Sequence, residues 1–138
     1  MSTTTVELRS VAGTGAAMGW AGGHTVVVDR PDGKAGCRGL GFNGAELLGL
    51  AIGGCFANDL RYTADAMGVA LGDIGLTVTV TLEGDPLLAT AASMAVTCTT
   101  LDGTEPRSVV ERARSTCLVS NSLSRGVPVD IHFATSVV

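Results

Sequence analysis

A single long amphipathic pattern in residues 45–67 constrains the fold more than any other feature of the sequence. The segment reads AELLGLAIGGCFANDLRYTADAM. Five of its residues recur at spacings of four and three and so share one face of a helix: Leu48, Ile52, Cys55, Asp59 and Tyr62. Asn43 is suited to the N-cap and Gly68 follows the last turn. The pattern therefore predicts one long helix over residues 45–67.

Three glycines lie within this predicted helix. Gly49, Gly53 and Gly54 each weaken a helix by about 1 kcal/mol relative to Ala. We expect close packing against another backbone to offset that loss.

The rest of the chain predicts strands and two shorter helices. Alternating or β-branched runs predict strands over 5–11, within 24–33 up to a Pro-Asp-Gly turn, and over 74–84, 92–103 and 127–137. Residues 12–23 are rich in Gly and Ala but are compatible with a further strand, and the glycine-rich residues 34–44 predict a loop. A helix capped by Thr104, with Pro106 in its first turn, is predicted over 104–117, and a second over 118–126 with Gly126 as C-cap. This order predicts an α+β fold rather than alternating βαβ units.

Composition restricts the classes of protein that the chain can belong to. At 138 residues, with 46% apolar and 16% charged residues, it predicts one folded domain over residues 1–138. The net charge of −4 argues against nucleic-acid binding, which needs clustered Lys and Arg. The mean hydropathy of +0.39 is high for a monomer, so we expect a second copy to cover apolar surface.

The sequence offers no sign of a membrane or export segment. Glu46, Asn58 and Asp59 interrupt the best apolar run before it reaches the roughly 18 residues of a membrane span. The N-terminus lacks a cationic start and an apolar stretch, which argues against a signal peptide. We therefore expect a cytoplasmic protein.

The four cysteines leave three interpretations open. Cys37, Cys55, Cys98 and Cys117 contain no CxxC pair, and only two His accompany them, so a four-ligand zinc site is not expected. A cytoplasmic location argues against a disulfide framework. A helical cysteine is by default a small core residue, yet Cys55 shares its face with Asp59 and has small neighbours. From the residues alone, these thiols remain core residues, a structural disulfide or redox groups.

Two longer motifs point to a known family. The stretch FNGAELLGLAIGGCFANDLRYTADAMGV is followed by CLVSNSLSRGVPV, whose cysteine lies about sixty residues after Cys55, and together they resemble the OsmC/Ohr family of osmotically inducible and organic hydroperoxide resistance proteins. The resemblance covers residues 43–130. It implies an intertwined homodimer with antiparallel sheets, a long central helix carrying Cys55, and a thiol site at the subunit interface.

The resemblance also implies an activity. Cys55 is similar to the peroxidatic cysteine and Cys117 to the resolving cysteine of a cofactor-free, metal-free peroxidase. Such an enzyme acts in the oxidative stress response: it reduces organic hydroperoxides through a sulfenic acid and a disulfide, which an external dithiol then reduces. The alternatives are a non-catalytic protein that binds an apolar small molecule at the dimer interface and a purely structural dimer module.

The chain departs from the family pattern at the activating groups. Better-studied members carry a Glu ten residues before the first cysteine, where this chain has Ala45. At about 100° per residue, Glu46 lies roughly opposite Cys55 on a regular helix, so we expect it to support the first turn rather than the chemistry. Arg38 is the first candidate for an activating arginine and Arg30 the second. The other interpretation is that both are solvated loop charges.

Overall fold

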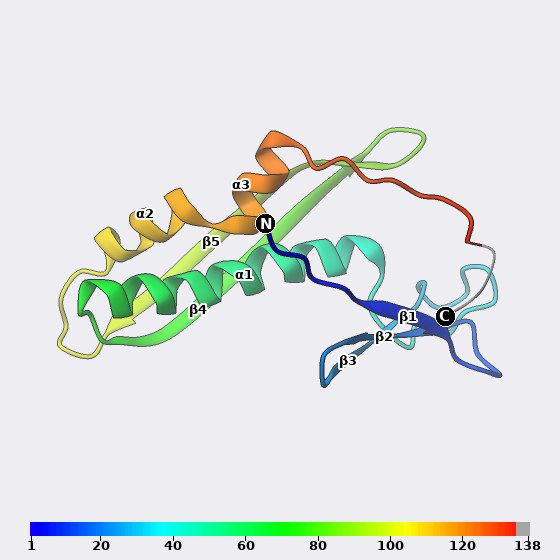
Figure 1. The fold of residues 1–138 in the computed structure, drawn as a ribbon, viewed down its shortest axis with the longest axis horizontal. Coiled ribbons are helices and arrows are strands. Elements are labelled where there is room, and N and C mark those ends of the chain that lie inside the picture. Colours follow the sequence, from blue (N-terminus) through cyan, green and yellow to red (C-terminus); the bar gives the residue numbers. More distant parts are fainter. Residues whose placement is uncertain (135–138) are drawn as a thin grey trace. The chain divides into compact units, whose positions relative to one another are not determined.

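The computed structural model describes residues 1–134 (Figure 1). The chain forms two compact units. We call residues 1–50 and 79–93 the N-terminal unit, and residues 51–78 together with the chain from Met94 onward the cysteine unit. Each is described by itself, and the single domain over 1–138 stays a prediction.

The N-terminal unit contains a three-stranded antiparallel sheet in the order β1-β2-β3. The strands are β1 (Glu7–Ser10), β2 (Ala17–Ala21) and β3 (His24–Val28). Gly19 of β2 pairs with a residue on each neighbouring strand, and a Cβ atom there would lie only 3.3 Å from the Leu8 and Val26 side chains. Because Gly19 has no side chain, the Leu8 and Val26 side chains can pack over the backbone of β2. The strands predicted within 5–11 and 24–33 are confirmed, and β2 occupies the compatible segment between them.

After β3 the chain loops out and returns beside the same strand. Phe42 lies next to Val28 in a parallel bridge, and its backbone N–H donates to the carbonyl oxygen of Val27 at 3.0 Å. A Cβ atom on Gly41 would collide with the backbone carbonyl of Val27. Glycine is required here because the two backbones approach too closely for a side chain. The predicted loop over 34–44 is therefore tied to β3 at its far end.

Helix α1 (Gly44–Met67) is the long helix that the sequence predicts over 45–67. It begins with a reciprocal capping box. The backbone N–H of Glu46 donates to the Asn43 side-chain oxygen at 2.9 Å, and the Asn43 N–H donates to the Glu46 carboxylate at 3.0 Å. Gly68, with φ of +69°, ends the helix in the left-handed region. Asn43 is thus confirmed as the N-cap.

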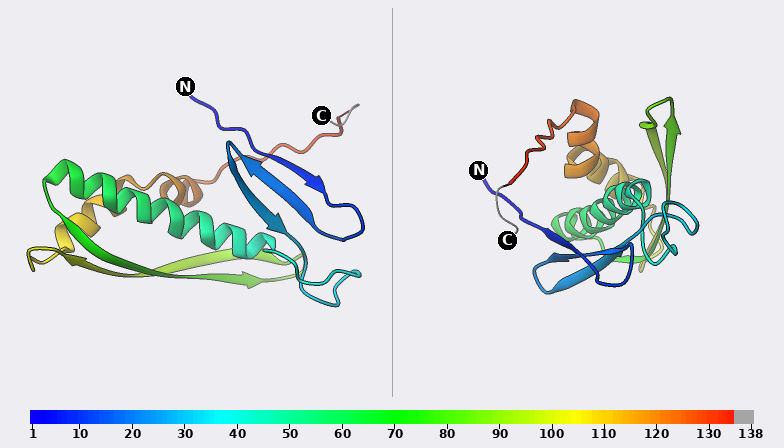
Figure 2. Two further views of the ribbon diagram at one scale, coloured as in Figure 1. Left: turned by 90° about the horizontal axis from the view of Figure 1, so that it is seen from below. Right: turned by 90° about the vertical axis from the view of Figure 1, so that its right-hand side faces the viewer.

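In the cysteine unit, helices lie on one side of a β-hairpin, whose residues 79–93 are assigned to the N-terminal unit (Figures 1 and 2). The hairpin strands are β4 (Leu71–Glu83) and β5 (Leu88–Thr100), followed by α2 (Arg107–Thr116) and α3 (Leu118–Arg125). Alternate residues of β4 and β5 pack against the helices. The core consists of seven buried residues: Phe56, Leu60, Ala64, Leu71, Val109, Ala113 and Cys117.

The expectation that the glycines of α1 pack closely against another backbone is met only in part. Gly53 is buried, and a Cβ atom there would lie 3.0 Å from a methyl carbon of Val78 on β4. A Cβ atom on Gly54 would have no neighbour within 4 Å. Close packing therefore accounts for Gly53, and the neighbour is a side chain rather than a backbone.

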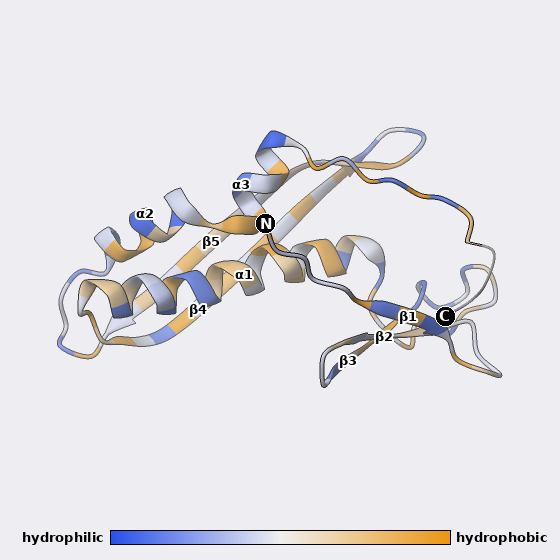
Figure 3. Cartoon of the chain, viewed as in Figure 1, coloured by the Kyte–Doolittle hydropathy of each residue, from blue (hydrophilic) through white to orange (hydrophobic). Residues whose placement is uncertain are grey.

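Two predicted features differ in the structure. Helix α2 begins at Arg107 with Pro106 as its N-cap, so the predicted Thr104 cap is wrong; the Thr104 hydroxyl donates to Asp102 instead. The predicted strand over 127–137 is not formed in residues 127–134, and residues 135–137 lie outside the described part of the chain. The apolar alternation is present there (Figure 3). A strand also needs a neighbouring strand to pair with, and none of the described strands pairs with residues 127–134.

No helix within residues 1–134 has both the length and the apolar character that crossing a bilayer requires.

Candidate functional site

The structure brings together the two cysteines that the sequence singles out. The Sγ atoms of Cys55 and Cys117 lie 3.9 Å apart, and both residues are free thiols. Cys55 projects from the middle of α1. Cys117 is an extended residue, with φ of −60° and ψ of 119°, that ends α2 and serves as the N-cap of α3. The break between the two short helices thus sets the position of the second sulfur.

The two thiols differ in their access to solvent. Cys117 is 1% exposed and belongs to the core of the cysteine unit, whereas Cys55 is only half-buried at its edge. A small molecule from solvent can therefore reach Cys55 more readily than Cys117.

Asp59 adds a carboxylate to this pair. It follows Cys55 by one turn of α1, and the Cys55 thiol donates to its Oδ2 atom at 3.6 Å. The two sulfurs and a carboxylate oxygen of Asp59 all lie within 4.8 Å of one another. We call Cys55, Asp59 and Cys117 the thiol cluster. The spacing of four residues places Asp59 on the Cys55 face, but sequence reasoning did not include it among the site residues.

The surroundings of Cys55 favour its neutral form. Burial raises the pKa of the Cys55 thiol most, and the neighbouring Cys117 and Asp59 raise it further. A hydrogen bond from the backbone N–H of Val119, at the start of α3, acts in the opposite direction and lowers the pKa. The two sulfurs therefore lie close together, while the surroundings of Cys55 favour its neutral thiol form.

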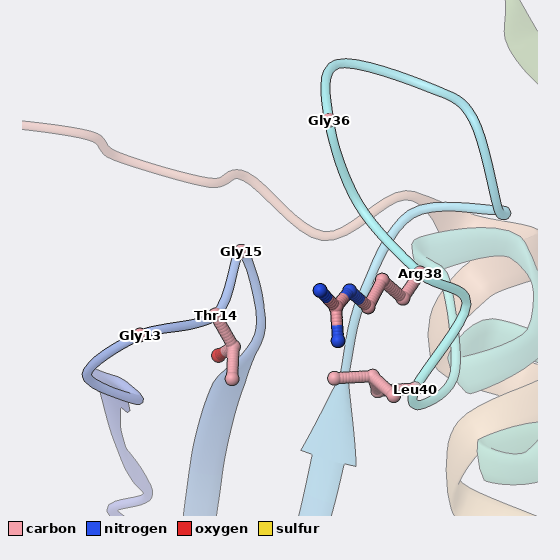
Figure 4. Close-up of a pocket in the computed structure, with 6 residues that line it drawn as sticks. All are labelled: Gly13, Thr14, Gly15, Gly36, Arg38 and Leu40. Carbon is pink, nitrogen blue, oxygen red and sulfur yellow. The ribbon is translucent and has the colours of Figure 1, made fainter.

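Arg38 lies in the N-terminal unit, in the loop between β3 and α1. It lines a cavity of about 390 Å³ whose other walls come from two glycine-rich turns: Gly13, Thr14, Gly15, Gly36 and Leu40. Its guanidinium group points toward the turn that carries Thr14 (Figure 4). No carboxylate within residues 1–134 forms an ion pair with it. A role for Arg38 at the thiols stays a prediction.

Comparison with known proteins decides the family. The family model described as "OsmC-like protein" matches residues 34–132, which include both cysteines of the thiol cluster. The chain belongs to the OsmC-like protein family. No curated protein sequence matches the chain.

Solved structures show the same fold at low sequence identity. An OsmC-like protein of unknown function from Vibrio cholerae superimposes with a TM-score of 0.75 at 10% identity, over 88% of this chain and 93% of that one. An OsmC-like protein from Mycoplasma pneumoniae gives a TM-score of 0.73 at 12% identity, over 89% and 88%. An organic hydroperoxide resistance protein OsmC from Legionella pneumophila gives 0.61 at 21% identity, over 88% of each chain. The OsmC-like α+β fold, with antiparallel sheets and a long central helix, is thus confirmed.

Arg30, the second arginine candidate in this OsmC-like chain, is held by its own loop. Its guanidinium donates to the carbonyl oxygen of Gly15 at 3.1 Å and lies 3.9 Å from the carboxylate of Asp29. Asp29 is buried and accepts the backbone N–H groups of Arg30 and Leu40 at 2.8 and 2.9 Å. The bond from Leu40 is the main reason why the pKa of Asp29 is lowered. Arg30 and Asp29 thus shape the loop that carries Arg38, and no sequence motif pointed to Asp29.

The contacts of the remaining candidate residues indicate roles in local structure. The carboxylate of Glu46 is the acceptor in the α1 capping box, which agrees with its expected place in the first turn. Cys37 is buried, and its thiol contacts the carbonyl oxygens of Pro31 and Lys34. Cys98 is a half-buried strand thiol that packs against the core of the cysteine unit.

Proposed function

We propose that this chain is a thiol-dependent peroxidase that reduces organic hydroperoxides. The 3.9 Å separation of the Cys55 and Cys117 sulfur atoms carries the proposal. A disulfide needs about 2.05 Å, so a small movement of the side chains joins the two thiols. The OsmC-like fold supports the same conclusion, since one structural relative is described as an organic hydroperoxide resistance protein.

The difference in exposure assigns the two roles. The thiolate of Cys55, the more accessible sulfur, attacks one peroxide oxygen; the O–O bond breaks, an alcohol leaves and a sulfenic acid forms. Cys117 attacks that sulfenic sulfur, a disulfide forms and water leaves. An external dithiol then reduces the disulfide by exchange. The N–H of Val119 stabilises the attacking thiolate, since it lowers the pKa of Cys55.

We propose Arg38 as the cation that aids peroxide reduction. Its guanidinium forms no ion pair within the described chain and is open to a cavity, whereas Arg30 is bound to Gly15 and Asp29. A cation near the thiolate would lower the pKa that burial and Asp59 raise.

We also propose a homodimer. Four apolar residues alternate along the chain after α3 and are exposed by 56 to 94%: Val127, Val129, Ile131 and Phe133. An exposed alternating segment of this kind is costly in water and lacks only a neighbouring strand. A second copy of the chain would supply the missing edge. Sedimentation at low micromolar concentration should show two chains, and a folded monomer there would contradict the proposal.

The decisive test of the activity uses cysteine variants with cumene hydroperoxide. Cys55→Ser should abolish peroxide consumption. Cys117→Ser should reduce one equivalent and stop as a sulfenic acid, which a dimedone label detects by mass spectrometry. Cys98→Ser is the matched control and should retain full activity. Unchanged steady-state activity in Cys55→Ser would exclude the proposed mechanism.

The raised pKa of Cys55 favours one second candidate, a non-catalytic protein that binds an apolar small molecule at the dimer interface. A thiol kept neutral packs against an apolar ligand without the cost of burying charge. This function predicts that Cys55→Ser leaves binding of an apolar fluorescent probe intact and that the wild type consumes no peroxide.

A further inference from the structure

The thiol cluster has the composition of a metal site. Two sulfurs and one carboxylate oxygen, from Cys55, Cys117 and Asp59, lie within 4.8 Å of one another. Thiolate sulfur and carboxylate oxygen are both ligands of Zn²⁺, and catalytic zinc sites use three protein ligands with the fourth position open.

Two of the three distances already match a zinc tetrahedron. With Zn–S bonds of about 2.3 Å and a Zn–O bond of about 2.1 Å, tetrahedral geometry requires roughly 3.8 Å between two sulfurs and 3.6 Å between sulfur and oxygen. The structure has 3.9 Å between Cys55 and Cys117 Sγ, and 3.6 Å between Cys55 Sγ and Asp59 Oδ2. The third distance, from Cys117 Sγ to the Asp59 carboxylate, is at most 4.8 Å. Metal binding would therefore require the Asp59 carboxylate to turn toward Cys117.

The backbone holds these ligands in place before any metal arrives. Cys55 and Asp59 are one turn apart on α1, so their spacing follows from helix geometry. Cys117 is fixed at the junction of α2 and α3, and its side chain is packed in the core. Cys117 therefore has little side-chain freedom to lose on binding, which favours affinity.

The electrostatics of the cluster also favour a cation. Ionised Cys55, Cys117 and Asp59 would repel one another at the short separations between their ligand atoms. A divalent cation at the centre would attract all three negative groups and so offset their mutual repulsion. The feature that disfavours a free thiolate thus favours a metal-bound one.

We propose that the reduced thiol cluster binds a Zn²⁺-like divalent cation through Cys55 Sγ, Cys117 Sγ and the Asp59 carboxylate. The metal replaces the proton on each thiol, so two protons leave per ion bound and no group is oxidised. The fourth position is left for water. A regulatory consequence rests on the proposed function: metal and hydroperoxide compete for Cys55, so bound metal protects the reduced enzyme and inhibits it.

Cobalt titration of the reduced full-length protein tests the site directly. Co²⁺ has a visible spectrum in tetrahedral sites and a near-ultraviolet thiolate band, so ligand type and geometry are read together. We expect one ion per chain. Cys55→Ser and Cys117→Ser should each weaken binding at least about 100-fold, and Asp59→Asn about 10-fold, since even outer-shell partners contribute roughly 10- to 100-fold. Circular dichroism confirms that each variant is folded.

Matched controls separate the cluster from other ligands. Cys98→Ser removes another thiol of the cysteine unit, and Asp65→Asn removes an exposed carboxylate of α1; both should bind like the wild type. A wild type without the thiolate band, or a band that survives in Cys117→Ser, overturns the proposal. So does a loss of binding in Cys98→Ser, because the ligand would then be a different sulfur.

The two proposals fail in different measurements. Cobalt binding without peroxide consumption contradicts the peroxidase and leaves the metal site standing. Peroxide consumption without the cobalt spectrum contradicts the metal site alone. If both stand, one equivalent of Zn²⁺ should slow oxidation of Cys55 by cumene hydroperoxide, and a chelator should restore the rate.

Discussion

Two aspartates, one in each unit, show how differently a carboxylate acts in different surroundings. Asp29 is buried beside backbone N–H groups that donate to both of its oxygens, and the bond from Leu40 lowers its pKa. Asp59 faces the Cys55 thiol and helps to raise the pKa of that thiol. The first carboxylate stabilises a loop, and the second disfavours ionisation of a neighbouring thiol. The difference arises because backbone donors accompany Asp29, whereas Asp59 meets groups that become negative themselves.

The two regions also differ in what positions their functional groups. Packing in the cysteine unit places the two sulfurs 3.9 Å apart. Hydrogen bonds to Asp29 and from Arg30 shape the loop that carries Arg38. Core mutations should therefore disturb the thiols, and polar mutations should disturb the arginine loop.

The largest expected effect tests the role of packing. Leu60 is fully buried in the core that also contains Cys117, so Leu60→Ala should lower the free energy of unfolding by about 2 to 5 kcal/mol and slow formation of the Cys55–Cys117 disulfide. Leu101→Ala, at a residue 75% exposed, should change stability by no more than about 0.5 kcal/mol. Urea unfolding measures both. Equal losses in the two variants would contradict the comparison.

A pair of arginine variants separates reactivity from loop structure. Arg38→Gln should slow Cys55 oxidation about 10-fold while leaving stability nearly unchanged, because its guanidinium makes no ion pair in the described chain. Arg30→Gln should do the reverse and lower stability by about 1 kcal/mol, because it loses the bond to Gly15. Stopped-flow oxidation and thermal unfolding measure the two properties. If Arg30→Gln slowed Cys55 oxidation and Arg38→Gln did not, the roles assigned to the two arginines would have to be exchanged.

Removing the charge of Asp59 should make Cys55 more reactive. The Asp59 carboxylate raises the pKa of the thiol, so Asp59→Asn should lower that pKa and speed alkylation by iodoacetamide roughly 2- to 10-fold at pH 7. The rate of alkylation rises with pH as the thiolate forms. The midpoint of this pH profile should move to lower pH in Asp59→Asn. Asp65→Asn is the control, and a chelator keeps metal out. An unchanged midpoint would show that the carboxylate does not influence the thiol.

Acid should loosen the Arg38 loop before it affects the thiols. The folded-state pKa of Asp29 is lowered, so its contribution is fully present above the unfolded value of about 4 and is lost as pH falls through the folded value. Exchange of the Leu40 amide proton, which donates to Asp29, should quicken in acid beyond its intrinsic rate. In the Asp29→Asn variant, the Leu40 amide proton should exchange rapidly already at pH 7. In the Asp32→Asn variant it should remain protected. Equal protection in all three proteins would contradict the role of Asp29.

The smallest expected effect concerns Glu46. Its carboxylate accepts the Asn43 N–H at the start of α1, so Glu46→Gln should change stability by about 0.3 to 1 kcal/mol. The rate of Cys55 oxidation should stay the same. A collapse of that rate would show that Glu46 orients a group at the thiols after all.

The sequence by itself predicted most of the helices and strands and singled out the two cysteines. Helical spacing and an Asn–Glu pair are local signals, so α1 and its cap were predictable to within a residue. The strand predicted over 127–137 is wrong for residues 127–134, because strand formation depends on pairing with a neighbouring strand, which the local sequence pattern does not record. The family motifs pointed to Cys55 and Cys117, but only the tertiary structure decided that their sulfurs meet and that Asp59 joins them. It also decided that Arg30 is engaged while Arg38 has no ion-pair partner among the described residues. Charges far apart in the chain acquire their partners only when the chain folds, and no local pattern records which partner each one finds.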